Sequence, residues 1–159
     1  MVVIEGIALC FWLLFVCAVG IANGPAGLVV FYEQDVQDRV VELGLTTKEK
    51  IKKTAVITGT ALFLPILIAV PYMVCYVNSA EGFRDRFIQM TVILLISGLF
   101  DRIFIDWYWV GHTKAWQIPG TEDLKPYIPG KTLFKKWFST LVFAPLIYVL
   151  MAWIIDRLV

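Results

Sequence analysis

Four long apolar segments, separated by more polar stretches, constrain the fold of this chain more than any other feature. They cover about residues 2–23, 54–77, 86–110 and 133–157. Each is close to the roughly 20 residues that a helix needs to cross a bilayer. Backbone N–H and C=O groups find no water inside a bilayer, so each segment must satisfy its own hydrogen bonds as a helix. The sequence therefore predicts a single domain, an all-α integral membrane bundle of four transmembrane helices.

The composition agrees with a membrane protein and excludes several other classes. The chain is 59% hydrophobic and 17% charged, whereas soluble domains carry roughly 25% charged residues. A net charge of +1 gives no reason to expect nucleic acid as a partner. Three cysteines without a Cys-x-x-Cys motif and a single histidine argue against a metal site or a cofactor. The expected partners are the lipid bilayer and, in a homo-oligomer or a larger membrane complex, other protein chains.

The basic residues are distributed unequally between the two sides of the predicted bundle. Only three basic residues, Arg84, Arg86 and Arg157, lie on the side of the membrane that holds the chain termini. The two long connections hold five basic residues each, namely Arg39, Lys48, Lys50, Lys52 and Lys53 in the first and Lys114, Lys125, Lys131, Lys135 and Lys136 in the second. Positively charged loops stay in the cytoplasm. We therefore expect a plasma-membrane protein with both termini outside and both long loops cytoplasmic.

The connections contain signals for shorter elements. Residues 34–43 place Val36 and Val40 on one side of a helix and acidic residues on the other, which predicts a short amphipathic helix on the cytoplasmic membrane surface. Two polar pairs with capping-box spacing precede the second and third spans: Thr46 with Glu49, and Asn78 with Glu81. We expect each pair to begin a helix.

The third span carries three charged residues where lipid-facing side chains would be apolar: Asp101, Arg102 and Asp106. Ionisable groups inside a membrane are costly, so they usually mark a functional site. On a helical projection they share one half of the circumference with Ser97, Gly98, Tyr108, Trp109 and His112, while the other half is apolar. Asp106 and His112 lie about 7 Å and 16 Å beyond Asp101 along the helix axis, toward the cytoplasm.

Arg102 and Asp106 are four residues apart and can form a salt bridge on one helix. This pairing leaves Asp101 without a partner on its own helix. A carboxylate in a low dielectric takes up a proton, binds a cation or accepts hydrogen bonds from a neighbouring element. Candidate donors are Tyr148, Asn23 or a lysine from the cytoplasmic loops. A structural hydrogen-bonded core, proton or cation coupling, and recognition of a polar ligand or lipid headgroup all remain open.

The second long connection, residues 111–131, contains two Pro-Gly pairs and polar residues that could fold over the cytoplasmic mouth of the bundle. Long connections of this kind are often functional. Together with the polar half of span three, it gives a candidate ligand-binding set of Asp101, Arg102, Asp106, Tyr108, Trp109, His112, Lys114, Glu122 and Asp123.

No reaction motif accompanies these residues: His-Glu-x-x-His, Gly-x-Ser-x-Gly and phosphate-binding glycine loops are all absent from the sequence. The favoured function is therefore non-enzymatic, a transport component or accessory subunit with a proton- or cation-coupled polar site in the cytoplasmic half of span three. The alternative is a membrane-embedded enzyme or binding protein for a lipid headgroup or amphiphile at the cytoplasmic leaflet. An enzyme would use Asp101, Asp106 and His112 as acids and bases. A cavity open sideways to lipid would favour the alternative, and one around a symmetry axis would favour conduction.

Overall fold

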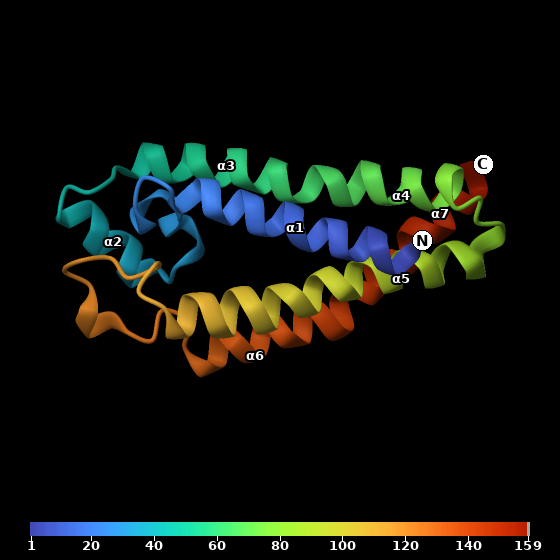
Figure 1. Ribbon diagram of the computed structural model, residues 1–159. Helices are drawn as coiled ribbons and strands as arrows, with labels where there is room; N and C mark the ends of the chain where they lie inside the picture. Colours follow the sequence, from blue (N-terminus) through green and yellow to red (C-terminus); the bar gives the residue numbers. More distant parts are fainter. Residues whose placement is uncertain (159) are drawn as a thin grey trace.

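The structure, a computed structural model, describes residues 1–158, and these contain helices and no strands. Four long helices are apolar enough to cross a membrane, which confirms the predicted all-α bundle (Figure 1). They are α1 (Val2–Ile21); α3 (Lys48–Leu64) with η2 (Pro65–Ala69), α4 (Val70–Tyr72) and η3 (Met73–Val77); α5 (Gly82–Phe100) with η4 (Asp101–Val110); and α6 (Gly130–Phe138) with η6 (Ser139–Phe143) and α7 (Ala144–Leu158).

The bundle has two distinct ends (Figure 1). The terminal end holds the start of α1, the end of α7 and the turn between η3 and α5. The loop end holds η1 (Pro25–Phe31), α2 (Gln34–Glu42) and the connection that contains η5 (Glu122–Leu124). Helices α1 and α5 consequently run parallel and pack directly on each other. At Gly6 the approach is so close that a Cβ would lie 2.9 Å from the Cβ of Ile96.

Two apolar clusters hold the ends together. At the terminal end, α4 and η3 meet α5 and α7 in a cluster that includes Val70, Val74, Ile93 and Ala152. At the loop end, the cluster is formed by Leu28, Val29, Tyr32, Val36, Val40, Trp116, Ile118 and Tyr127, with Cys17 and Ile105 from the spans. The predicted amphipathic helix is therefore present as α2. Its apolar residues Val36 and Val40 are fully buried against other parts of the protein.

The fourth long helix joins the bundle unevenly. Helix α7 contributes Ala152 to the terminal-end cluster, whereas α6 and η6 contribute no buried residue to either cluster. Helices α3 and α6 lie on opposite sides of the α1 and α5 pair at the loop end, and α7 approaches α4 at the terminal end (Figure 1). The two outer helices therefore diverge from the terminal end toward the loop end.

Both predicted capping pairs are wrong in detail. Thr47, not Thr46, is the N-cap of α3, because its backbone is extended and its hydroxyl accepts the N–H of Lys50 at 3.2 Å. Asn78 caps no helix start. Its amide nitrogen instead donates to the Glu5 carboxylate of α1 at 2.9 Å, a contact between residues 73 positions apart.

Candidate functional site

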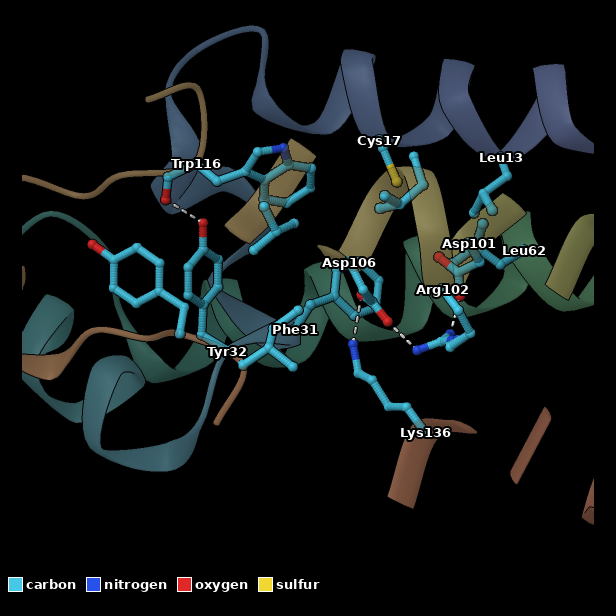
Figure 2. A pocket seen from close by; sticks show the side chains of 14 residues that line it. Leu13, Cys17, Phe31, Tyr32, Leu62, Asp101, Arg102, Asp106, Trp116 and Lys136 are labelled. Carbon is cyan, nitrogen blue, oxygen red and sulfur yellow. Dashed lines mark hydrogen bonds and ion pairs between the residues drawn. The ribbon is translucent and has the colours of Figure 1, made fainter. Parts of the chain in front are cut away.

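Four charged side chains meet inside the loop-end half of the bundle (Figure 2). Arg102 donates through Nη2 to Asp101 and through Nη1 to Asp106. Lys136 reaches the other oxygen of Asp106 from α6, with 2.8 Å between Nζ and Oδ1. The side chains of Asp106 and Arg102 are only 6% and 12% exposed. We call these residues, Asp101, Arg102, Asp106 and Lys136, the charge cluster.

The cluster confirms one predicted contact and corrects another. The ion pair between Arg102 and Asp106 forms as expected from their spacing. The expectation that Asp101 has no partner on its own helix is wrong, because the guanidinium group presents N–H donors on two edges and binds both carboxylates. A lysine does reach in from the loop end, but Lys136 binds Asp106. With two acidic and two basic groups, the cluster has no net charge.

A cavity of about 230 Å³ lies beside the charge cluster. It contacts all four helices of the bundle, through Leu13 and Cys17 of α1, Leu62 of α3, the cluster residues of η4, and Lys136 of α6. Trp116 closes it toward the loop end, and Figure 2 shows Trp116 and Tyr32 on that side. We call it the cluster cavity.

A second cavity of about 280 Å³ lies next to the first, on its terminal-end side. The two share the lining residues Leu13, Leu62, Asp101 and Arg102. The far part of the second cavity is lined by Ile66, Leu94, Thr140, Ala144 and Tyr148, among others. Both cavities have α3 on one side and the α6 to α7 helix on the other, so together they form one groove floored by α1 and α5. We call this the lateral groove, and its second part the deep cavity.

Small side chains on α5 and η6 shape the wall of the groove. Gly98 of α5 faces Thr140 of η6 so closely that a Cβ on Gly98 would lie 2.8 Å from the Thr140 methyl group. A larger residue at position 98 would push the fourth helix away from α5. The glycine therefore sets the distance between α5 and η6 beside the deep cavity.

A third cavity, of about 510 Å³, lies beyond Asp106 at the loop end and is lined by Trp107, His112, Gln117 and Lys125, among others. His112 is exposed, and its Nδ1 lies 2.6 Å from the carbonyl oxygen of Trp107. His112 therefore lies outside the lateral groove. Asp106 and Tyr127 border both the third cavity and the cluster cavity.

The other residues of the sequence-based set are placed apart from the charge cluster. Tyr108 is 50% exposed, and Lys114 is exposed. The Trp109 ring packs edge-on against Trp116, with 5.3 Å between ring centroids. Asp123 receives two hydrogen bonds of 3.2 Å from Arg39 of α2. Hydrogen bonds from its own amide and that of Gly120 lower the pKa of the exposed Glu122.

A network of buried hydroxyl groups makes the loop-end wall of the cluster cavity rigid. The Tyr32 hydroxyl donates to the carbonyl oxygen of Trp116 at 2.6 Å. The Tyr127 hydroxyl lies 2.8 Å from the Thr121 hydroxyl and accepts the N–H of Ile118 at 3.2 Å. Burial raises the pKa of Tyr32 above its ordinary value, so the phenol stays protonated and keeps its donor. The wall is therefore preformed.

Sequence reasoning missed several residues that line this site: Cys17, Tyr32, Leu62, Trp116 and Lys136. Trp116 lies in the second long connection, and its place there is the signal that the sequence gives for it. Lys136 was expected only as one of the basic residues of the second long connection.

The buried polar atoms without a partner fall into two groups. Beside the cluster cavity they are two donors, Arg102 Nε and Trp116 Nε1. In the terminal half of the bundle they are the acceptors Glu5 Oε1, Asn78 Oδ1 and Gln89 Oε1, the donor Arg86 Nε and the hydroxyl Thr91 Oγ1. Unpaired buried donors therefore occur in both halves of the described bundle.

The chain matches no family model, no curated protein and no solved structure in comparisons with known proteins.

Proposed function

We propose that this small multi-pass membrane protein binds an amphiphile in the lateral groove, with the polar end at the charge cluster and the hydrocarbon chain in the deep cavity. The observation that carries the proposal is that the two cavities share four lining residues, Leu13, Leu62, Asp101 and Arg102. Arg102 borders both of them, so a polar end and an apolar end meet at one side chain. Ligand sites are typically apolar cavities with a few placed polar groups.

The dimensions of the groove suit a chain that enters from the side. Leu94 lines the deep cavity seven residues before Asp101, which corresponds to about 10 Å along the helix. The outer helices α3 and α6 share no apolar cluster at this level. Separation of α3 from α6 favours entry between these two helices, in the half of the membrane nearer the loop end.

Cation or proton coupling at Asp101 has less support than amphiphile binding. Arg102 already neutralises Asp101, and Asp106 accepts from Arg102 and Lys136. A bound cation would have to displace a paired basic group. Catalysis has less support as well, because His112 lies in a different cavity from Asp101. The proposal is therefore binding, by an accessory or transport component, without a chemical step.

We further propose that the loop end faces the cytoplasm of a plasma-membrane protein, as the ten basic residues of the two connections favour. Arg84→Cys at the terminal end and Ala115→Cys at the loop end are both exposed positions. In intact cells a membrane-impermeant thiol reagent should modify the first variant above the wild-type background and spare the second. The reverse pattern would invert the orientation.

A substitution that fills the lateral groove tests whether an amphiphile binds there. Leu62→Trp places a large side chain in both cavities. Leu64→Trp is the matched control, because Leu64 lies two residues along α3, is 50% exposed and lines none of the three cavities described here. Native mass spectrometry of the purified full chain should show a retained lipid-sized adduct in the wild type and in Leu64→Trp, and its loss in Leu62→Trp. Equal adducts in all three proteins would contradict the proposal.

A further inference from the structure

The two outer walls of the lateral groove are held in different ways, and the difference points to the wall that moves. We infer that α6 is a lateral gate: it swings away from η4 about η6 to admit the amphiphile, and the ion pair of Lys136 with Asp106 holds it closed. The inference rests on the proposed function, because it states how the ligand of the lateral groove enters.

Helix α3, the first outer wall, is anchored along its length. Ile51 in its first turn packs against the apolar cluster of the loop end. Further along, the carbonyl oxygen of Ala61 accepts a hydrogen bond of 2.8 Å from Trp12 Nε1 of α1. The helix continues into α4 and η3, whose Val70 and Val74 are fully buried in the cluster of the terminal end. This wall is therefore fixed at both ends.

The fourth long helix, the second outer wall, is anchored by apolar packing at the terminal end alone. Ala152 of α7 is fully buried there, and Met151 and Ile155 pack against the same cluster. Residues 130–143, which form α6 and η6, contain no buried side chain and belong to neither apolar cluster. Helices inside a membrane associate through close packing and interhelical hydrogen bonds. With little packing, α6 depends on its hydrogen bonds.

Two polar side-chain contacts join α6 to other elements within residues 1–158. Lys136 Nζ lies 2.8 Å from Asp106 Oδ1 of η4 (Figure 2), and the Thr132 hydroxyl donates to the Glu33 carboxylate before α2. The ion pair can open without stranding a charge, because Arg102 still neutralises Asp106. Lys136 is 29% exposed, and its long side chain can carry the ammonium group toward the membrane surface. The ion pair therefore suits a reversible latch.

The fourth long helix changes geometry between its free half and its anchored half. Residues 139–143 form a π-helical turn, and Pro145 follows it without an N–H for the carbonyl oxygen of Leu141. Such turns and prolines are common sites of helix kinks. Thr140 in this turn packs closely on α5, since a Cβ on Gly98 would lie 2.8 Å from its methyl group. The turn therefore provides a pivot for α6.

The gate borders each of the three cavities described above. Leu133 lines the third cavity, Lys136 lines the cluster cavity, and Ser139 and Thr140 of the pivot line the deep cavity. Outward movement of α6 would consequently open the groove from the loop end, while the packing of α7 keeps the terminal end closed. An amphiphile in the nearer half of the membrane then enters from the side.

Distances between pairs of spin labels in the full chain, reconstituted in nanodiscs, measure this movement. The labels are attached to introduced cysteines in a background whose three native cysteines are replaced by alanine. The gate pair is Phe134→Cys on α6 with Val56→Cys on α3. The reference pair is Leu150→Cys on α7 with Tyr72→Cys on α4. All four positions are more than half exposed.

Lys136→Met removes the latch and keeps a long side chain. We expect it to lengthen the main distance of the gate pair by about 5 Å, half the diameter of a helix with its side chains, and to leave the reference pair unchanged. Thr132→Val should lengthen the gate pair by less. Lys135→Met is the matched control and should change neither pair, because Lys135 is exposed, forms no ion pair within the described residues and lines none of the three cavities.

An unchanged gate pair in Lys136→Met, or an equal lengthening in Lys135→Met, would overturn the inference. A change in both label pairs would overturn it as well, because the ion pair would then hold the whole bundle and not α6 alone.

The proposed function and this inference fail in different ways. If the wild type and Leu62→Trp retain equal lipid-sized adducts, the amphiphile site is wrong whatever the label distances show. If the adduct depends on Leu62 and the gate pair does not respond to Lys136→Met, only the gate is wrong.

Discussion

The charge cluster and the buried Glu5 of the terminal end solve the same physical problem in opposite ways. Both place ionisable groups among apolar helices, where an isolated charge is costly. The charge cluster pairs two acids with two bases. At the terminal end, Glu5 is 7% exposed and is held by one amide of Asn78, and the unpaired atoms of both side chains are acceptors.

The packing around the two regions also differs. Next to Glu5 the helices are joined by the cluster of Val70, Val74 and Ala152, whereas the charge cluster borders the lateral groove. The contrast teaches that charge pairing alone does not identify a binding site. The candidate site is where paired charges and a cavity coincide.

The largest expected effect is that of Arg102→Ala, which leaves Asp101 without a base and the buried Asp106 with Lys136 alone. We expect the free energy of unfolding to fall by about 3 kcal/mol, because removal of a base from buried carboxylates is strongly destabilising. Steric-trapping or thermal unfolding in detergent would measure it.

The choice of second substitution sharpens this prediction. Lys136 still holds Asp106 after Arg102 is removed, so Asp101→Asn should restore more stability to Arg102→Ala than Asp106→Asn does. If Asp106→Asn restores more, the assignment of Lys136 to Asp106 is wrong.

At the terminal end, Arg86→Ala should have a smaller effect, a loss of about 1 to 2 kcal/mol. Arg86 binds Asp156 at 2.8 Å, but the Asp156 side chain is 34% exposed and can be solvated when Arg86 is removed. The same unfolding assay measures the change. A loss larger than that of Arg102→Ala would reverse the order of the two regions.

Glu5→Gln should stabilise the protein by about 1 kcal/mol. The new amide keeps an oxygen for Asn78 Nδ2 and adds donors that can reach the unpaired Asn78 Oδ1. The neutral substitution Arg102→Gln at the charge cluster should instead destabilise. If Glu5→Gln destabilises as well, the carboxylate charge has a partner, and the contrast between the two regions fails.

The smallest expected effect is that of Arg39→Ala, which removes the ion pair with Asp123. The two side chains are 37% and 61% exposed, and exposed pairs contribute about 0 to 1 kcal/mol. Thermal unfolding should differ little from the wild type, and the difference should vanish at high salt. A large, salt-independent loss would show that this contact holds the loop end closed.

The sequence predicts the fold but only part of the site. The length of the apolar segments predicts the four helices, and the four-residue spacing of Arg102 and Asp106 predicts their ion pair. The contact of Lys136 with Asp106, that of Asn78 with Glu5 and the position of Trp116 join residues from different elements. These contacts depend on how each helix is rotated and how deep it lies relative to its neighbours. Neither quantity follows from a pattern within one segment.

The most direct test is an experimental density map of the full chain in lipid nanodiscs, at a resolution that separates lipid from water. We predict elongated density in the lateral groove that begins beside Arg102 and runs toward Tyr148. A groove filled only by water, or closed by direct packing of α3 on α6, would contradict the account.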